Sequence, residues 1–402
     1  MSASIQDSST PVPLQDHPRS VSLLLNVGHA LDHLFLLIFA TAVGAIAVDF
    51  GMQRWEDLMP YSVGAFFLFG LCSLPAGRLG DLWGRRQMIL VFFFGLGGAA
   101  LLTAMAQSPW QLAAGLALIG AFAAIYHPVG IPMLVQRASR PGMVIGINGL
   151  AGNLGVACAA LITGFLVQWW GWRAAFVVPG LVSIVCGVVF GLRCQAQGPA
   201  PGRRRQHQHA QLSSSQLARA LVVMTAAAIT GSLLFNFTTN GNTQFLAERF
   251  DGIIENPAMI GALLAAIYVV ASFAQIVVGY LIDKFPFKRV YLCIVLAQIP
   301  WLILAAMASG WWVFVALAGA MACIFGGIPF TDAMIVKYVD DGVRSRVAGM
   351  RLAVSFSVSS LAVWLLGPIV KTSGFTSLFL AMAVVAAVSA SLVLLLPQSE
   401  RA

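Results

Sequence analysis

The chain has 402 residues, of which 59% are hydrophobic and only 9% are charged. A soluble domain carries about 25% charged residues, so this composition excludes an ordinary soluble protein and indicates that lipid surrounds most of the chain. The formal net charge of +8 requires no nucleic-acid partner, because it follows from the membrane topology that the basic residues predict.

Twelve apolar stretches are long enough to cross a membrane as helices, for which roughly 20 residues suffice. They run continuously, without the polar and apolar alternation of a membrane β-barrel, so we expect helices. The predicted fold is therefore an all-α membrane protein. In chain order the stretches are 21–48, 58–76, 87–106, 110–135, 143–168, 172–193, 217–245, 259–282, 288–308, 311–336, 346–370 and 374–396.

The polar segments divide these spans into two sets of six. Residues 1–20 are polar and unlike a cleavable signal, so we expect a cytoplasmic tail. Residues 195–216 are rich in Gly, Pro, Ser and Gln, which predicts a cytoplasmic linker between bundles at 21–194 and 217–397. Residues 398–402 form the C-terminus. His207 and His209 in the linker are too weak a signal to predict a metal site.

The basic residues predict the orientation. If both termini are cytoplasmic, 19 of the 23 Lys and Arg residues lie on the inner side. Only Arg54, Arg173, Arg249 and Lys371 lie outside. This asymmetry follows the positive-inside rule and requires an even number of spans. The short loops favour a bacterial inner (plasma) membrane.

A charged motif occurs twice, at an offset of 202 residues, and each copy is expected to be a short loop between two spans. Asp81 lies at a membrane boundary, where it can cap a helix N-terminus and pair with Arg in one conformation only. We therefore expect a gating loop that latches one state; the alternative is that the charges only fix the topology. The gating residues are Gly77, Asp81, Gly84, Arg85, Arg86, Gly279, Asp283 and Lys288.

Ionisable residues inside the bilayer are costly and mark functional sites. In the first span, His29, Asp32 and His33 share one helix face, and His127 falls at a similar depth in the fourth span. We expect these four residues to couple transport to protons; the alternatives are a fixed hydrogen bond between helices or, from composition alone, metal binding. No metal site is predicted.

Polar residues near this cluster and in two later spans are candidates for substrate contact. Asn26 and Tyr126 accompany the histidines, and Asn236 and Asn240 lie one turn apart in the seventh span. Asp332 near the end of the tenth span is a weaker candidate. For the seventh span an alternative stays open, in which the helix ends near residue 237 and an external loop follows.

The motif Gly77-x-Leu79-x-Asp81-x-x-Gly84-Arg85-Arg86 resembles the signature loop between helices 2 and 3 of the major facilitator superfamily. The resemblance covers essentially the whole chain and implies two parallel-repeat six-helix bundles, with helices 1, 4, 7 and 10 lining a central cavity. Leu82 and Pro286 depart from the usual pattern.

Two shorter stretches, Ala124 to Gly130 and Gly152 to Gly155, resemble the fosmidomycin-resistance-like efflux subgroup of that superfamily. This resemblance implies proton-driven export of a small amphiphilic or anionic compound, and the superfamily resemblance implies a working monomer. A proton-coupled importer of an organic nutrient and a non-transporting receptor or scaffold are the alternatives. No phosphate loop or nucleophile elbow occurs, so we expect no enzyme activity and no cofactor.

Overall fold

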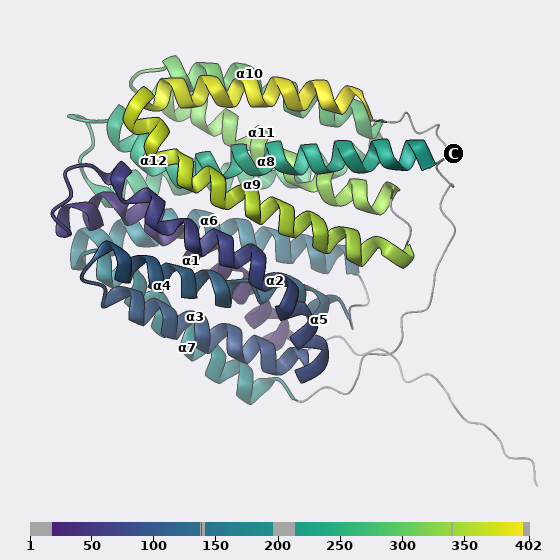
Figure 1. Ribbon diagram of the computed structural model, residues 1–402, viewed down its shortest axis with the longest axis horizontal. Helices are drawn as coiled ribbons and strands as arrows, with labels where there is room; N and C mark the ends of the chain where they lie inside the picture. Colours follow the sequence, from purple (N-terminus) through teal and green to yellow (C-terminus); the bar gives the residue numbers. More distant parts are fainter. Residues whose placement is uncertain (1–17, 137, 139–140, 196–213, 339–340, 397–402) are drawn as a thin grey trace, which may run out of the picture.

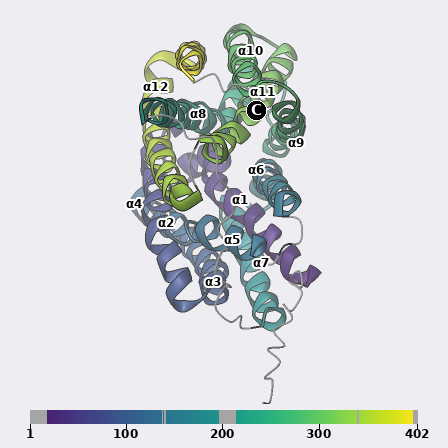
Figure 2. The same cartoon turned by 90° about the vertical axis from the view of Figure 1, so that its right-hand side faces the viewer.

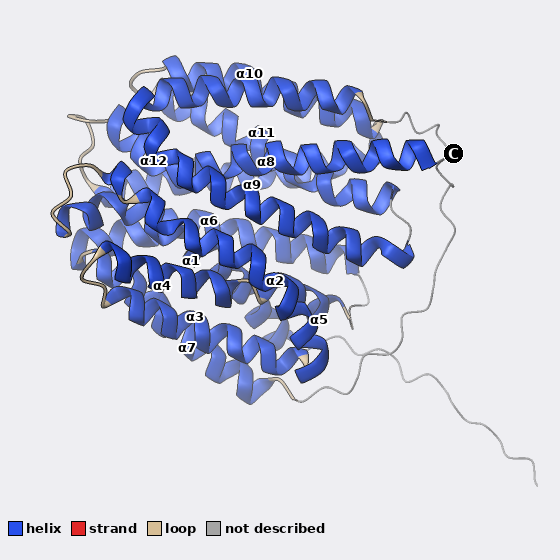
Figure 3. Cartoon of the chain, in the orientation of Figure 1, coloured by secondary structure: helices blue, strands red, loops and turns tan. Residues whose placement is uncertain are grey.

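The computed structural model describes residues 18–136, 138, 141–195, 214–338 and 341–396. It shows long helices lying side by side in one bundle (Figure 1). Within these ranges every regular element is a helix and no strand occurs (Figure 3). The predicted all-α class is therefore confirmed.

The first half of the chain supplies one set of helices. They are α1 (Arg19–Asp49), α2 (Val63–Trp83), α3 (Arg85–Ala104), α4 (Pro109–Ala123), α5 (Ile131–Val135), α6 (Pro141–Trp170) and α7 (Trp172–Arg193), with the short helical turns η1 (Trp55–Asp57), η2 (Met59–Ser62) and η3 (Tyr126–Gly130).

The second half supplies the other set, which lies above the first in Figures 1 and 2. The two halves meet where α6 lies against α9 and where α2 lies against the first part of α12. The elements are α8 (Ser214–Arg249), α9 (Pro257–Lys284), α10 (Phe287–Met307), α11 (Trp312–Tyr338) and α12 (Asp341–Leu394).

Eleven helical segments in the described ranges are long and apolar enough to cross a membrane. The last of them, Ala353–Leu394, has 42 residues, about twice the length that one crossing needs. Its backbone leaves the helical conformation at Gly374, where φ is 73° and ψ is 170°. The segment is therefore two spans joined by a one-residue turn, and the predicted count of twelve is confirmed.

The turn glycines repeat between the halves. Gly171, between α6 and α7, has a φ of 79°, close to the 73° of Gly374. Residues with a side chain rarely adopt this left-handed region, so both turns need glycine. Each is followed by an aromatic residue that packs in the core, Trp172 and Phe375.

The helix starts at one end of the bundle also have local causes. Ser108 accepts a hydrogen bond from the backbone N–H of Gln111 just before Pro109 opens α4. Asn256 accepts bonds from the second and third residues of α9, which opens with Pro257. A polar cap followed by proline satisfies the otherwise unpaired N–H groups at a helix start.

Apolar side chains face outward as well as inward. Phe67, Leu74, Phe273 and Val277 are each at least half exposed on the bundle surface. Monomeric soluble proteins rarely expose large contiguous apolar surfaces, whereas a spanning helix presents such residues to lipid. The exposed apolar surface therefore agrees with a multi-pass membrane protein.

The predicted loop at residues 77–86 is wrong for most of its length. α2 continues to Trp83, and the chain turns only at Gly84, where φ is 98°, before α3 begins at Arg85. The residues from Gly77 to Trp83 are all compatible with a helix, so α2 continues through them. It ends only at Gly84, which adopts a positive φ. The second copy behaves similarly, because α9 continues to Lys284.

The two halves contact each other at the end of the bundle that carries η1, which we call the η1 end. Among the described residues, both side-chain hydrogen bonds that join the halves lie there. Gln168 accepts from the backbone N–H of Ala258 at 3.2 Å, and the Lys371 ammonium pairs with the Asp57 carboxylate.

Two glycines bring α6 and α9 into backbone contact near the same end. A Cβ atom on Gly261 would lie 2.4 Å from the carbonyl oxygen of Ala160 and 3.3 Å from the Cα of Gly164. Small residues at such crossings allow helices to pack closely within a membrane. The η1 end is therefore closed between the halves in this conformation.

Candidate functional site

The site is built on α1, which places three ionisable side chains on one face. His29 and Asp32 are three residues apart and His29 and His33 four apart, so a helix brings them together. Asp32 is 0% exposed and His29 is 5% exposed. All three lie well inside the 31-residue helix, at a depth where a charge is costly.

The fourth member, His127, comes from the irregular turn η3 between α4 and α5. The sequence predicts one continuous span at 110–135, but residues 126–130 adopt a π-helical turn. Such single wide turns are frequent at functional sites. Pro128 and Pro132 each lack a backbone N–H, so the regular ladder cannot be completed in this region.

The structure brings the predicted proton-coupling residues together. The ring centroids of His29 and His33 are 5.0 Å apart, those of His29 and His127 are 5.1 Å apart, and those of His33 and His127 are 5.7 Å apart. The His127 Nε2 atom lies 3.4 Å from an oxygen of Asp32. We call these four residues the histidine cluster.

Within the cluster some polar atoms have no hydrogen-bond partner among the described residues. They are both carboxylate oxygens of Asp32 and the Nε2 atom of His29. Burying such atoms without a partner is unfavourable, and ionised groups are the most costly. An arrangement of this kind is typical of a site that binds protons or a ligand.

A hydrogen-bonded frame holds His29 in place. Its Nδ1 lies 2.7 Å from the backbone oxygen of Asn148 in α6. The Asn148 side chain donates to Asn26 at 2.9 Å and to the Tyr126 hydroxyl at 2.8 Å. That hydroxyl in turn donates to the carbonyl of Leu25 at 2.6 Å. The network therefore ties α1, η3 and α6 together.

Asn148 is the residue that sequence reasoning missed. It belongs to the glycine-rich part of α6, which reads first as a packing surface. Gly152, one turn later, lies under the imidazole: a Cβ there would come within 2.8 Å of His29 Nε2. Gly155 similarly lets α6 approach the backbone of Ala30. The sequence contains one signal for it, which is an asparagine among the small residues of the fifth span.

The histidine cluster touches the other half of the chain through aromatic side chains. Phe356 in α12 lies 6.1 Å from the His127 ring and 4.2 Å from the ring of Phe69, measured between centroids. A Cβ on the neighbouring Gly70 would lie only 2.8 Å from the Cβ of Phe356. The cluster is thus next to the contact between α2 and α12.

The polar stretch of the seventh span is helical throughout. α8 continues to Arg249, so the alternative in which the helix ends near residue 237 is wrong. Asn236 and Asn240 are both buried. Asn236 donates to Ser359 at 2.8 Å, and Asn240 donates to the carbonyl of Asn236 at 3.0 Å. These local bonds satisfy polar groups in an apolar setting and let the helix continue.

Asn236 and Asn240 do not join the histidine cluster. No hydrogen bond or ring contact between residues that the structure describes links them to it. α8 nevertheless approaches α1, because a Cβ on Gly44 would lie 3.5 Å from the side-chain oxygen of Gln244. Asp332 belongs to α11, but its side chain lies outside the described part of the chain.

The glycines of the first motif contact η3 rather than forming a loop. A Cβ on Gly77 would lie 3.3 Å from Pro128, and one on Gly80 would lie 2.9 Å from Val129. α2 therefore packs directly on the turn that carries His127. The equivalent glycine of the second motif, Gly279, has open space around it.

The charged residues of the motifs make distinct contacts. Arg85 donates to Gln136 at 2.7 Å. Asp81 and Asp283 are exposed and make no side-chain hydrogen bond or ion pair with any described residue, and α3 has no side-chain cap. The latch expected of Asp81 is therefore not formed in this conformation, and its role stays a prediction.

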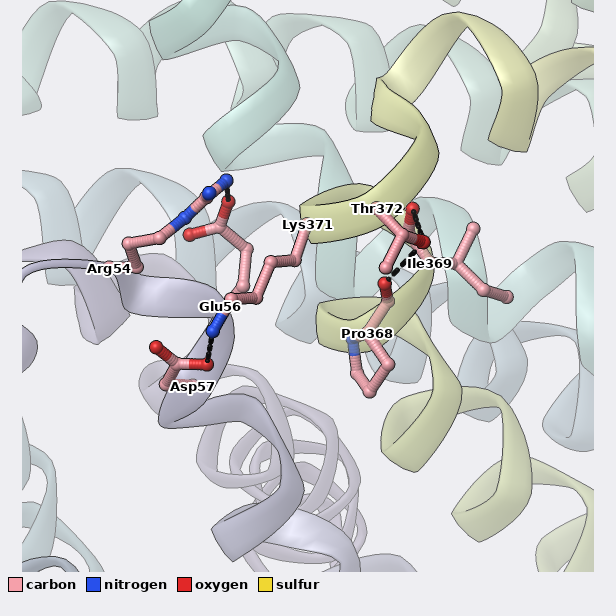
Figure 4. A network of polar contacts seen from close by, with 7 residues as sticks. All are labelled: Arg54, Glu56, Asp57, Pro368, Ile369, Lys371 and Thr372. Carbon is pink, nitrogen blue, oxygen red and sulfur yellow. Dashed lines mark hydrogen bonds and ion pairs between the residues drawn. The ribbon is translucent and has the colours of Figure 1, made fainter.

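Charged residues also gather at the η1 end (Figure 4). The Arg54 guanidinium donates to Glu56 at 2.7 Å, and Lys371 reaches Asp57 from the other half. The hydrogen bond that Arg54 donates to Glu56 raises the pKa of the Arg54 guanidinium above its usual value. Glu56 is mostly buried, and a Cβ on Gly367 would lie 2.2 Å from its backbone oxygen. This network joins the start of the second span to the end of the eleventh.

Twelve apolar helices in two matching halves, with a buried ionisable cluster between helices, define a polytopic membrane protein built like a secondary transporter. The sequence profile of the Major Facilitator Superfamily matches residues 25–253 and 245–402. The chain belongs to the Major Facilitator Superfamily.

Similar proteins agree with this assignment. The chain is 26% identical over 359 residues to the multidrug resistance protein MdtG of Dickeya zeae, covering 85% of both chains. It is 31% identical over 181 residues to a probable actinorhodin transporter of Streptomyces coelicolor. That match covers 43% of this chain but only 31% of the relative, so the chain spans about a third of the relative's length.

Solved structures confirm the fold. A bacterial homologue of the human lysosomal transporter Spinster, in an inward-facing and occupied conformation, superposes with a TM-score of 0.77. The alignment covers 94% of this chain and 96% of that one at 16% identity, so it establishes the architecture alone. Family and neighbours are transporters, in agreement with the expectation that the chain is not an enzyme.

Proposed function

We propose that this protein is a proton-coupled exporter of a small amphiphilic or anionic compound. It works as a monomer in a bacterial inner membrane, with both termini in the cytoplasm. The resistance and transporter names of its relatives support export, as does its resemblance to the fosmidomycin-resistance-like subgroup.

The observation that carries the proposal is the setting of Asp32. Its carboxyl group is fully buried inside a spanning helix, has no hydrogen bond among the described residues, and is accompanied by three imidazoles. Transporters keep such groups in their spans to bind protons. Phe356 from the other half packs against His127, which lies 3.4 Å from Asp32, and this closeness to the contact between the halves supports a coupling role.

The closed η1 end corresponds to one state of the proposed transport cycle. In the predicted topology this end faces the outside, so the conformation is closed outward. Export by alternating access requires this contact to open and the opposite end to close, with the compound in between. Asn26, Tyr126, Asn236 and Asn240 are the proposed substrate contacts, with Asp332 as a further candidate.

The test uses inverted membrane vesicles, acidified inside by respiration. Compounds come from a resistance screen in a host that lacks its own efflux pumps, with fosmidomycin among the amphiphilic and anionic antibiotics tested. We expect the best compound to accumulate inside the vesicles and to release protons, reported by a pH-sensitive dye. Accumulation only in right-side-out vesicles would instead identify the alternative, a proton-coupled importer.

Asp32→Asn is the decisive variant. It should reduce proton-driven accumulation to background while membrane insertion stays normal, because a neutral amide cannot exchange a proton. Asp251→Asn, on the exposed loop after α8, is the matched control and should retain wild-type flux. Full proton-driven flux in Asp32→Asn would remove this carboxylate from the mechanism. No flux for any compound would favour the receptor or scaffold alternative.

A further inference from the structure

We infer that the histidine cluster is a binding site for one divalent transition-metal ion of the Zn²⁺ or Co²⁺ type, held by the imidazoles of His29, His33 and His127 with the Asp32 carboxylate beside them. The inference goes beyond the proposed function and does not require transport. It also goes beyond the sequence, which shows the residue types but not their separations.

The ring geometry matches three imidazoles around one ion. Zinc lies about 2.0–2.1 Å from a histidine nitrogen, which places each ring centroid roughly 3.2 Å from the ion. Three rings at tetrahedral angles would then have centroids about 5.2 Å apart. The observed separations are 5.0, 5.1 and 5.7 Å. One ligand nitrogen from each ring lies within 4.8 Å of the other two.

The Asp32 carboxylate lies beside the three imidazoles and supplies a negative charge that favours a bound cation. The Asp32 oxygen lies 3.4 Å from His127 Nε2. Three imidazoles with an open fourth position are a known donor set for Zn²⁺, and Co²⁺ adopts the same geometry.

The hydrogen bonds around His29 prepare it as a ligand. Because a carbonyl can only accept, the Nδ1–H group donates to the backbone oxygen of Asn148. The lone pair is then on Nε2, which has no hydrogen-bond partner among the described residues. A backbone carbonyl that orients the far nitrogen is the usual second-sphere partner of a metal-binding histidine.

The walls of the site fix the rings. Tyr126 stacks on His29 with centroids 4.8 Å apart, and Gly152 also lies against this ring, where any Cβ would collide with it. Phe69 and Phe356 lie edge-on against His127. Simple packing explains the rings' contacts, but it leaves the lone pair of His29 Nε2 without a hydrogen-bond partner among the described residues, and a cation would satisfy it.

The experiment measures Co²⁺ binding to the purified full-length protein after chelator treatment. Co²⁺ absorbs visible light strongly when its geometry is tetrahedral, so the spectrum reports the coordination directly. We expect saturation at one ion per chain and full displacement by Zn²⁺. His33→Ala and His127→Ala should each weaken binding by at least about 10-fold.

His33→Cys tests direct coordination. A thiolate ligand gives Co²⁺ a near-ultraviolet charge-transfer band, which appears only if the side chain at position 33 touches the ion. The matched control is the double variant His207→Ala/His209→Ala, which removes two imidazoles from the linker and should bind as the wild type does. Gel filtration and thermal unfolding check that each variant is folded.

Three outcomes would overturn the site: no saturable Co²⁺ binding, loss of binding in the linker variant alone, or no charge-transfer band in a folded His33→Cys protein that still binds Co²⁺. Export measured in the presence of chelator separates this inference from the proposed function. Absent metal binding with intact proton-driven export refutes only the metal site. Intact Co²⁺ binding without export refutes only the transporter.

Discussion

Arg86 and Lys288 make equivalent hydrogen bonds in the two halves of the molecule. Arg86 donates to the carbonyls of Gly191 and Cys194, at the end of α7. Lys288, which lies 202 positions later, donates to the carbonyls of Leu394 and Leu396, at the end of α12. Each therefore ties the third span of its half to the C-terminus of the sixth, where a cation also complements the helix dipole.

Replacing Arg86 or Lys288 should destabilise the protein without abolishing transport. Arg86→Ala leaves two carbonyls without their charged donor, and we expect a loss of about 1–2 kcal/mol of stability. Lys288→Ala should cost a similar amount, and the double variant should show the sum, because the sites lie in different halves. Thermal unfolding in detergent measures both, with Arg86→Lys as the conservative control. Unchanged unfolding temperatures in both alanine variants would contradict the capping role.

The ion pair between Asp57 and Lys371 should bias the molecule toward the conformation that is closed at the η1 end. Both side chains are about 40% exposed, so the pair contributes no more than about 1 kcal/mol. Lys371→Ala should then raise the open population by at most about fivefold. Spin-label distances between Met52 and Ser373 measure it. The swap Asp57→Lys/Lys371→Asp should restore the wild-type distribution, and failure to do so would show that the pair is not the cause.

Asp81 is expected to act in a conformation other than this one, because here it is exposed and makes no side-chain bond with a described residue. Asp81→Asn should leave the protein folded in the membrane and lower its transport rate. Vesicle flux is the measurement, and Glu255→Gln on the exposed loop before α9 is the control. Transport at the wild-type rate would refute the latch.

The backbone contact at Gly261 should tolerate no side chain. In Gly261→Val the Cβ alone would meet the Ala160 carbonyl at 2.4 Å, so α6 and α9 must separate. We expect export to fall sharply while insertion persists. Gly146→Ala, elsewhere on α6, has open space and should be neutral or slightly stabilising. Equal flux in the two variants would mean that this crossing does not have to close.

The topology itself can be measured. Reporter fusions after Arg205 and after Ala402 should lie on the same, cytoplasmic side, and a fusion after Arg54 should lie on the other. The matched repeat requires an even number of spans in each half. Reporters that place the linker and the C-terminus on opposite sides would contradict the paired halves.

Much of this architecture is predictable because lipid simplifies the pattern. Continuous apolar stretches locate twelve spans, and the repeated Gly171 and Gly374 mark equivalent turns. The spacing of His29, Asp32 and His33 places them on one face, and burial of α1 keeps them inside. These features follow from local periodicity and from the cost of exposing polar groups to lipid.

Other features depend on tertiary contacts that a single sequence does not display. Gly77 reads as a loop residue but serves as a close-packing position beneath Pro128. The π-helical turn at Tyr126 shifts the direction of His127 in a way that a regular helix would not. Asn148 reads as part of a packing surface, and only the folded bundle shows its bonds to Asn26 and Tyr126.

Phe356 connects the second half of the protein to the histidine cluster. Its side chain comes from one half of the protein and lies against the Phe69 and His127 rings of the other. Any movement of one half relative to the other would have to change the contact between the Phe356 ring and the His127 imidazole. The contact between the two halves is therefore adjacent to His127, and no long relay through the protein is needed to connect the two.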